Sequence, residues 1–326
     1  MKVLFVSSGN SNEGISPIIK NQGNSLISLG ISLDYFTVTG KGLKNYIKGI
    51  FILKNYLLKN RYDIIHAHYG LSAIVALIAR RKEKIVVSFM GDDLLGSRNS
   101  VGKITFFSKL LSLVNKNLSK HNYDAIIVKS EEMLCQFVKS SKFFLIPNGV
   151  NLTEFLPVNR ELAYEKTCWD SGRKHVVFIS DPKREEKNYS LASASVVELD
   201  DPTIELHIVN NIPNSQLVFL YSAADCIILT SFHEGSPNVI KEAMACNCPI
   251  VSTDVGDVRW VIGDTPGCFI ASFDPVDFAE KIKLAIEFRH KYGQTRGRER
   301  IIQLGLDSET VAKRIIKIYE RVISEN

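Results

Sequence analysis

Residues 226–245 read CIILTSFHEGSPNVIKEAMA, and they contain the pattern of a strand, a turn and a helix in that order. Cys226–Leu229 is apolar throughout, which is typical of a strand buried on both faces of a parallel sheet. Ser236 stands in a favourable N-cap position and Pro237 suits the first helical position. The helix is predicted over Asn238–Ala245, so this stretch is one βα unit of a doubly wound α/β fold.

The same alternation runs through the whole chain. It predicts two doubly wound, Rossmann-like domains, at residues 1–150 and 151–306, which face a central cleft. A last amphipathic helix at 307–326 is expected to pack back toward the first domain. Residues 150–173 have no clear period and are interpreted as a linker plus the approach to the second sheet. The predicted strands are Val3–Ser8, Ser32–Val38, Asp63–His68, Ile85–Phe89, Ala125–Val128 and Phe143–Ile146, then His175–Ile179, Ile204–Val209, Cys226–Leu229, Pro249–Thr253 and Cys268–Ala271.

Two glutamates flank the start of the helix in the opening stretch. Open α/β sheets bind ligands beyond the carboxyl ends of their strands, where Glu234 lies. Glu242 follows about one and a half turns into the helix, so the two carboxylates reach different parts of one ligand. Carboxylates accept hydrogen bonds strongly, and a pair of them suits the hydroxyls of two sugars. Gly235 lets such a ligand approach the backbone, and the helix N-terminus favours an anion.

Composition narrows the class of protein. The chain has 326 residues and 45% hydrophobic residues, enough for a core in each domain. It has no run of apolar residues long enough for a signal peptide core or a membrane span. The six cysteines have no metal-type spacing. These features predict a cytoplasmic protein. No Gly-x-Gly-x-x-Gly fingerprint follows a strand, which argues against a nicotinamide-dependent dehydrogenase.

Several segments together resemble the retaining glycosyltransferases of family 4, which have the GT-B fold. The stretch from Glu234 to Glu242 resembles the Glu-x7-Glu signature of that family. Similar family segments are Leu145–Asn151, Leu220–Asp225 and Pro249–Gly256. The resemblance implies a transferase that moves a hexose or N-acetylhexosamine from a nucleotide diphosphate sugar, with uridine as the base, to a glycan acceptor. It also implies retention of anomeric configuration, front-face attack and no divalent metal or other cofactor.

The resemblance also assigns candidate residues. The diphosphate is expected to meet cationic groups of Ser180–Asn188, where family members carry Gly-Arg and this chain has Ser180-Asp181. Lys183 and Arg184 are therefore alternatives for the role that the arginine of Gly-Arg has in the family. A solvated charged turn remains the other interpretation of this segment. The candidates are Glu234, Lys187 and Arg184 for catalysis; Glu242, Gly235, Ser236, Pro237, Asn238, Val239, Lys183, Gly9 and Gly14 for donor binding; and His68, Asp92 and Asp93 on the acceptor side.

The candidates in the first domain match the family more loosely. Gly9 and Gly14 stand where relatives have a Gly-Gly pair, and a purely geometric role in the turn is the alternative. Met90 replaces a histidine of the family, and a thioether cannot make that residue's polar contact. Asp93 matches the family aspartate. His68 follows a strand end and could face the cleft, or its ring could be satisfied by backbone groups.

Charge is unevenly distributed along the chain. Residues 1–150 carry 20 Lys and Arg against 9 Asp and Glu, whereas residues 151–326 carry 20 against 26. The basic helices 41–61 and 103–120 contain no acidic residue and interleave lysines with aromatic and aliphatic residues. Such helices suit an anionic membrane surface, and a pair of ordinary covering helices is the alternative. The pattern favours a lipid-linked glycan acceptor and a peripheral position on the inner face of the membrane. It does not favour nucleic acid.

Two further functions stay open at this stage. A nucleotide-sugar epimerase of the same fold would convert the donor without an acceptor. A non-catalytic subunit would bind a nucleotide sugar and leave it intact, which the substitution at Met90 keeps possible. The leading interpretation is a glycosyltransferase of surface polysaccharide biosynthesis.

Overall fold

The computed structural model describes residues 1–11, 14–40, 42–97, 104–138 and 140–325. These residues fall into two compact units. The first unit contains the chain up to Gly149 and resumes at Ser308, and the second contains Val150–Asp307. Lys41 and Lys103, which the sequence places in the two basic segments, lie outside the described residues.

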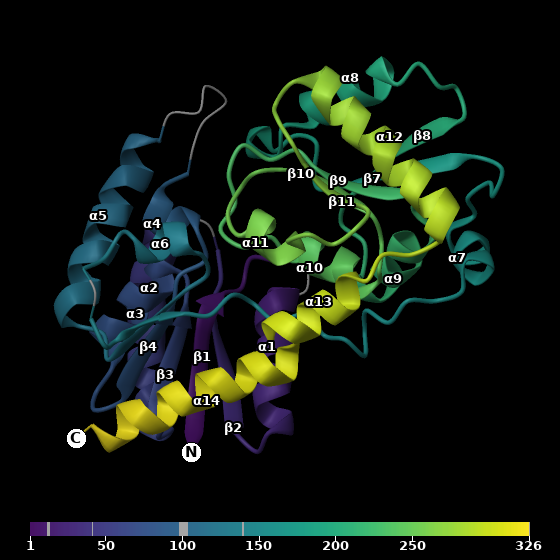
Figure 1. Ribbon diagram of the computed structural model, residues 1–326. Coiled ribbons are helices and arrows are strands. Elements are labelled where there is room, and N and C mark those ends of the chain that lie inside the picture. The colour runs from purple at the N-terminus through teal and green to yellow at the C-terminus, as the bar shows by residue number, and fades with distance from the viewer. Residues whose placement is uncertain (12–13, 41, 98–103, 139, 326) are drawn as a thin grey trace. The chain divides into compact units, whose positions relative to one another are not determined.

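The first unit is built on a six-stranded parallel sheet with the order β2-β1-β3-β4-β5-β6, of which Figure 1 labels the first four. Successive strand residues point to opposite faces, so Val3 and Phe5 pack in one apolar layer and Leu4 and Val6 in the other. The strands are β1 (Lys2–Ser8), β2 (Ser32–Val38), β3 (Ile64–His68), β4 (Lys84–Ser88), β5 (Ala125–Val128) and β6 (Phe143–Leu145).

Helices cover both faces of this sheet. Apolar residues of α1 and α14 share one core cluster with the strands, and those of α2 and α3 share the other. The helices of the first unit are α1 (Pro17–Ser28), α2 (Leu43–Lys59), α3 (Gly70–Ala79), α4 (Asp92–Leu95), α5 (Phe106–His121), α6 (Glu131–Leu134) and α14 (Ser308–Ser324).

The C-terminal helix α14 is an integral part of the first unit. Its Ile315, Ile318 and Val322 are buried in the cluster that contains the β1, β3, β4 and β5 side chains. The hydroxyl of Tyr319 lies 2.5 Å from Nδ1 of the buried His66. The last helix therefore completes the core of a sheet whose strands end about 160 residues earlier in the chain.

The second unit is built on a five-stranded parallel sheet with the order β11-β10-β9-β7-β8. Its strands are β7 (Lys174–Ile179), β8 (Ile204–Val209), β9 (Cys226–Leu229), β10 (Ile250–Thr253) and β11 (Cys268–Ala271). The helices are α7 (Arg160–Thr167), α8 (Tyr189–Glu198), α9 (Asn214–Ala223), α10 (Asn238–Ala245), α11 (Val258–Ile262), α12 (Pro275–Tyr292) and α13 (Gly297–Leu304), with a short 3-10 turn, η1, at Glu185–Lys187.

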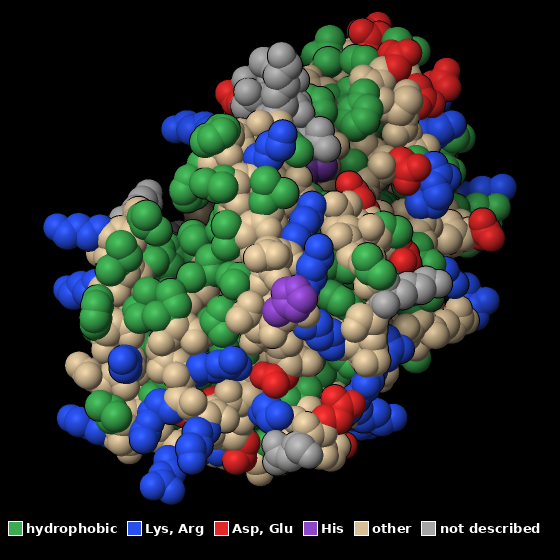
Figure 2. All heavy atoms as spheres, turned by 90° about the vertical axis from the view of Figure 1, so that its left-hand side faces the viewer, with side chains coloured by type: hydrophobic (Ala, Val, Ile, Leu, Met, Phe, Trp, Pro, Cys, Tyr) green, Lys and Arg blue, Asp and Glu red, His purple; other side chains and the backbone are tan. Residues whose placement is uncertain are grey.

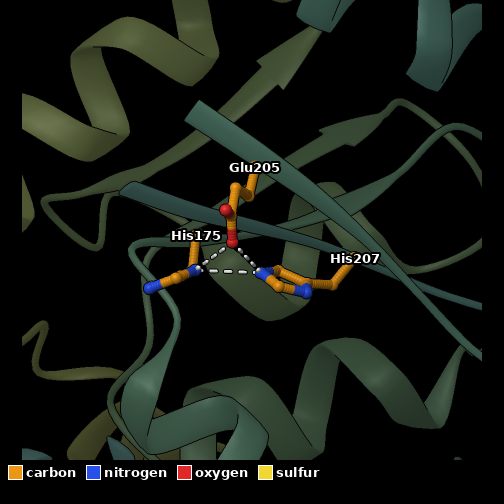
Figure 3. Close-up of side chains that lie close together, drawn as sticks. All are labelled: His175, Glu205 and His207. Atoms are coloured by element: carbon orange, nitrogen blue, oxygen red, sulfur yellow. Dashed lines mark hydrogen bonds and ion pairs between the residues drawn. The ribbon is translucent and has the colours of Figure 1, made fainter. Parts of the chain in front are cut away.

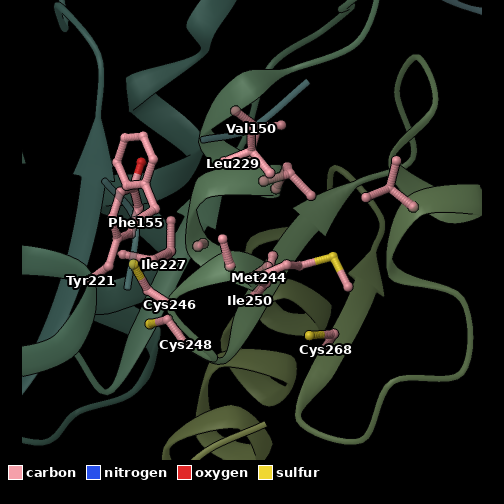
Figure 4. Packing of buried hydrophobic residues seen from close by; sticks show 14 of the residues in the cluster. Val150, Phe155, Tyr221, Ile227, Leu229, Met244, Cys246, Cys248, Ile250 and Cys268 are labelled. Atoms are coloured by element: carbon pink, nitrogen blue, oxygen red, sulfur yellow. The ribbon is translucent and has the colours of Figure 1, made fainter. Parts of the chain in front are cut away.

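Two apolar layers enclose this second sheet. One joins the strands to α8 and α12. The other, shown in Figure 4, gathers Ile227 and Leu229 of β9 with Tyr221 of α9 and Met244 of α10. Because α10 is anchored by this layer, the loop that precedes it is held at the carboxyl end of β9.

Every strand predicted from the sequence is present, with ends that differ by one residue at most. The interpretation of residues 150–173 as a linker plus the approach to the second sheet was incomplete, because α7 lies within them. Asn159 caps this helix by accepting hydrogen bonds from the backbone N–H groups of Glu161 and Leu162. Its short length and alternating charges conceal any apolar period. Among the described residues, no helix combines the length and the apolar character needed to cross a membrane.

Candidate active site

The loops after β7, β9 and β10 meet at one edge of the second sheet because these strands are parallel neighbours. Two hydrogen bonds join the β9 loop to the turn η1: Thr230 Oγ1 donates to the carbonyl of Lys187 at 2.9 Å, and the amide of Phe232 donates to the carbonyl of Glu186 at 2.9 Å. Thr253 at the end of β10 donates to the carbonyl of Ser231 at 2.8 Å. These bonds fix the loop that carries Glu234.

Lys187 and Glu234 form an ion pair across two of these loops. The lysine Nζ lies 2.5 Å from Oε1 of Glu234, and Ser231 Oγ donates to the same oxygen at 2.8 Å. The two side chains are only 16% and 15% exposed, so solvent screens their attraction weakly. Sequence reasoning singled out both residues for separate roles, and the structure places them in contact.

Glu242 lies on the inward side of α10 beside Tyr221. Its Oε2 accepts a hydrogen bond of 2.7 Å from the hydroxyl of Tyr221, which is fully buried. Burial raises the pKa of Glu242 to about 7, although the bond from Tyr221 and the charge of Lys241 oppose that rise. Because burial favours the protonated form, a ligand that needs a carboxylate there must favour the ionised form.

The start of α10 differs from its sequence prediction. The helix begins at Asn238 with Pro237 in the N-cap position, and Ser236 makes no capping bond. Instead, Ser236 Oγ lies 2.5 Å from Oδ2 of Asp257 and accepts a bond of 2.7 Å from Nζ of Lys241. The charged partners on either side attract the hydroxyl more strongly than the backbone N–H groups do.

Lys241 and Asp257 are site residues that sequence reasoning missed. Lys241 is 1% exposed, and its burial lowers the pKa of the ammonium group. Burial also raises the pKa of Asp257. A lysine in the middle of a short helix usually faces solvent, so the sequence contains no signal of this buried pair.

Glycines allow close packing around the loop. At Gly256, where φ is +57°, an added Cβ would lie 2.5 Å from the carbonyl oxygen of Gly235. Gly235 itself is buried, whereas Asn238 and Val239 are partly buried at the first turn of α10. The loops after β9 and β10 are therefore in backbone contact, and a side chain at Gly256 would separate them.

Lys183 and Arg184 are the most exposed of the cationic candidates. Arg184 is 54% exposed and pairs with Glu186 at 2.6 Å within its own turn. The backbone N–H of Lys183 donates to Oδ1 of Asp181. Both side chains can change conformation at little cost, since an exposed ion pair contributes little to stability.

In the first unit, Asp93 is a buried anchor. It is fully buried and accepts hydrogen bonds from the backbone N–H groups of Gly70, Met90 and Gly91, each at 3.0 Å. Burial raises its pKa to about 6 against the effect of these bonds. The neighbouring Asp92 is partly buried and accepts a bond from Ser97. Asp93 thus holds the loop after β4 against the start of α3.

The other candidates of this unit lie at strand ends. His68 is 1% exposed and stacks on His66 with ring centroids 4.4 Å apart. Among the described residues, neither of its ring nitrogens has a hydrogen-bond partner, so backbone groups do not satisfy the ring. Gly9 donates its N–H to the carbonyl of Val38. Gly14 has a φ of +80°, which favours glycine.

Two family models match the chain in succession. The model described as Glycosyltransferase Family 4 matches residues 28–154, and the model described as Glycosyl transferases group 1 matches residues 172–287. The chain belongs to glycosyltransferase family 4. In this glycosyltransferase, the match to the model described as Glycosyl transferases group 1 includes Lys187, Glu234 and Glu242, the residues at the edge of the second sheet.

Solved structures show that this glycosyltransferase has the GT-B fold. It is similar to sucrose-phosphate synthase from Thermosynechococcus elongatus, with a TM-score of 0.82, 18% identity and all of both chains covered. It is also similar to HepE of Anabaena, solved in complex with UDP and glucose, with a TM-score of 0.72, 15% identity, and 98% of this chain and 100% of that chain covered.

Among curated proteins, one relative aligns over nearly its full length. The glycosyltransferase is 23% identical over 335 residues to the N,N'-diacetylbacillosaminyl-diphospho-undecaprenol alpha-1,3-N-acetylgalactosaminyltransferase of Campylobacter jejuni, which covers 91% of this chain and 88% of that protein. The chain spans 58–64% of the length of the D-inositol 3-phosphate and teichuronic acid glycosyltransferases that it also matches.

Proposed function

We propose that this chain is a retaining transferase that moves a hexose or N-acetylhexosamine from a UDP-sugar to a lipid-linked glycan in surface polysaccharide biosynthesis. The observation that carries this proposal is the contact between Lys187 and Glu234 at the strand edge where α10 begins. An ammonium group and a carboxylate there suit a ligand that joins a diphosphate to a polyhydroxylated ring. The names of two similar proteins, one bound to UDP and glucose and one acting on a diphospho-undecaprenol glycan, support the choice of donor and acceptor.

In the proposed mechanism, Lys187 stabilises the departing diphosphate together with Arg184 or Lys183. The negative charge on the β-phosphate grows as the glycosidic bond breaks, so a fixed cation lowers the barrier. Glu234 then releases Lys187 to the phosphate and accepts hydrogen bonds from the sugar hydroxyls. Exchange of one anionic partner for another leaves Lys187 paired throughout, which avoids an uncompensated charge in a partly buried place.

Glu242 is proposed to bind the ribose of the nucleotide. Only one of its oxygens is bonded to Tyr221, which leaves the other to accept from a ribose hydroxyl. The N-terminus of α10 offers backbone N–H groups to the phosphates. Because these basic groups and N–H groups supply the positive charge, we propose that transfer needs no divalent ion. Acceptor contacts are assigned to the first unit, near Asp92, Asp93 and His68.

The helix α5 supports the proposed membrane partner because its buried face is polar and its exposed face is largely apolar, the opposite of an ordinary surface helix. Its buried residues are Ser108, Ser112, Asn115 and Ser119, spaced on one helical face. Ser112 donates to the carbonyl of Leu94, and Asn115 donates to the carbonyl of Asp93 at 2.9 Å. The serine and asparagine side chains therefore make most of the buried contacts, and most of the large apolar side chains face outward, although Leu118 packs against the core.

The outward face of α5 combines large apolar side chains with lysines. Phe106 is 85% exposed, and other large side chains of this helix are also exposed, namely Phe107, Leu110, Leu113 and Val114. Lys109 and Lys120 are exposed among them. In Figure 2, hydrophobic side chains gather on the face that includes α5, with Lys and Arg around them. Contiguous exposed apolar patches mark interaction sites, and the absence of acidic residues on this helix favours an anionic lipid surface.

The helix α2 adds a second exposed apolar stripe. Leu43, Ile47 and Phe51 are 60%, 49% and 65% exposed at a spacing of four residues, while Leu53 and Leu57 of the same helix are buried in the core. Lys44, Lys48 and Lys54 are exposed beside the stripe. We propose that α2 and α5 bind the membrane that contains the lipid-linked acceptor.

A two-stage experiment tests the proposed function. Nucleotide sugars are first screened by thermal shift, because a ligand that binds only the folded state raises Tm. The one that raises Tm most is then incubated with the protein, with and without undecaprenyl-diphosphate glycans. The proposal expects sugar transfer to the lipid-linked acceptor. Conversion of the donor without an acceptor would instead identify an epimerase, and binding without any turnover would identify a binding subunit.

A further inference from the structure

Three potential metal ligands converge on β7 and the edge strand β8 of the second sheet. His175 Nδ1 lies 2.9 Å from His207 Nε2, and Oε2 of Glu205 lies 3.7 Å and 3.6 Å from these two nitrogens. Figure 3 shows the three atoms directed at one another. The group lies away from the candidate active site, since His175 is near the start of β7 and the loop with Lys187 follows the end of that strand. Ile179 is four positions after His175, which is about 13 Å along a strand.

The strand register explains why these residues meet. In the parallel pair β7 and β8, His175 is the register partner of Glu205. Glu205 and His207 are two residues apart on β8, so they project from the same face of the sheet. Backbone geometry alone therefore brings the three side chains together, without any loop rearrangement.

The hydrogen bonds around His175 fix which nitrogen can bind a ligand. Its Nε2 lies 2.9 Å from the carbonyl oxygen of Asp170. A carbonyl only accepts hydrogen bonds, so Nε2 carries the proton and the lone pair of Nδ1 points at His207 and Glu205. A histidine that donates its outer N–H to a backbone carbonyl is the usual arrangement at metal sites.

The other two ligands are also oriented by neighbours. Arg173 Nε lies 2.6 Å from Oε1 of Glu205, which directs Oε2 toward the imidazoles. The indole of Trp169 stacks on His207 and His175, with ring centroids 3.9 Å and 4.8 Å away. His175 is fully buried, whereas His207 and Glu205 are 21% and 36% exposed. An ion can therefore enter from solvent on the side of β8, and water can complete its coordination.

The distances fit a small transition-metal ion. Zinc bonds to imidazole nitrogen and carboxylate oxygen are about 2.0–2.2 Å. At tetrahedral or octahedral angles, ligand atoms on such an ion are about 2.9–3.5 Å apart, which is close to the separations of 2.9, 3.6 and 3.7 Å observed here. Magnesium and calcium prefer all-oxygen sites, whereas two imidazoles and a carboxylate suit zinc and its neighbours.

We propose that His175, Glu205 and His207 form a binding site for a divalent transition-metal ion, with Zn²⁺ as the best fit. The ion connects the edge strand β8 to β7 and to the segment that carries Asp170 and Trp169. Its role is to stabilise the second unit, and it takes no part in sugar transfer. The site is thus compatible with a transfer step that needs no metal.

Untagged protein is treated with a chelator, which is then removed, and Zn²⁺ binding is measured by isothermal titration calorimetry beside Tm. The wild-type chain is expected to bind one ion and to gain several degrees in Tm. His207→Gln and Glu205→Gln should each weaken binding at least 10-fold and remove the gain in Tm. His121→Gln removes an exposed histidine of the first unit and should bind zinc like the wild type.

Two results would overturn the site. One is a wild-type chain that binds no zinc at millimolar concentration, in which case the 2.9 Å contact is only an N–H to N hydrogen bond. The other is equal binding by the wild type and both glutamine variants. Far-UV circular dichroism of each variant checks that it is folded. Weakened zinc binding by a folded variant then reports loss of a ligand and not loss of the fold.

Discussion

Lys187 Nζ lies 2.5 Å from Oε1 of Glu234, although the two residues are 47 positions apart in the sequence. The contact joins the loop after β7 to the loop after β9, so a change in either residue alters the charge of the other's surroundings. Lys187→Met should lower kcat by about 10²–10³, which is typical for loss of one electrostatic contact to a transition state. Glu234→Gln should lower kcat with a smaller change in KM.

The double variant distinguishes a coupled pair from two independent residues. If Lys187 and Glu234 act together, the loss in kcat/KM of the double variant is smaller than the product of the single losses. Lys283→Met, which removes an exposed lysine of α12, serves as the control and should be fully active. Full activity of both single variants would contradict the assignment of the pair.

The proposed ribose contact predicts a separate defect for Glu242. Glu242→Ala should weaken UDP binding about 10-fold, or ~1.4 kcal/mol, because it removes the acceptor that Tyr221 positions. Turnover at saturating donor should change less than it does in Glu234→Gln. Calorimetric titration with UDP measures the effect, and Glu198→Ala on the exposed side of α8 is the control. Unchanged UDP affinity in Glu242→Ala would rule out the ribose contact.

The raised pKa of Glu242 also predicts a dependence of stability on pH. Burial raises its pKa in the folded state to about 7, from an ordinary value of 4.5. Between these values the folded state holds the proton and the unfolded state has lost it, so stability falls as pH rises through this window. Glu242→Gln removes the cost, which is on the order of 1–3 kcal/mol. Urea unfolding at pH 4 and pH 8 should show a variant that exceeds the wild type in stability at pH 8 and nearly equals it at pH 4.

The outward apolar face of α5 predicts membrane binding that depends on named side chains. Phe106→Ser combined with Leu110→Ser should abolish binding to vesicles that contain phosphatidylglycerol, and the free energy of unfolding should change little because both side chains are exposed. Val197→Ser, which removes a 74% exposed valine of the second unit, should bind as the wild type does. Flotation assays measure the bound fraction. Equal flotation of all three proteins would contradict the surface.

The strands could be predicted from the sequence because a strand buried on both faces is apolar throughout, as Cys226–Leu229 is. The helix α5 was located correctly, but its orientation was not considered. A signal existed, since Ser108, Ser112, Asn115 and Ser119 fall on one helical face. Small polar residues at that spacing indicate a face that packs through hydrogen bonds to the backbone.

Other features depend on contacts that the sequence does not encode locally. The pairing of Lys187 with Glu234 needs the order of the strands in the sheet, and the burial of Lys241 needs its partners Ser236 and Asp257. The convergence of His175 and His207 needs the register of β7 against β8. The sequence does contain one signal, because His175 in β7 and Glu205 and His207 in β8 are polar residues within largely apolar strands.

Because α14 belongs to the first unit, that unit is discontinuous in the chain. During synthesis, residues up to Gly149 leave the ribosome before α14, so the part of one sheet face that α14 covers is still exposed, and the second unit follows as one continuous segment. A fragment that ends at Gly149 would keep this apolar face exposed and should aggregate, so an isolated first unit should be expressed with residues 308–326 joined to it by a linker.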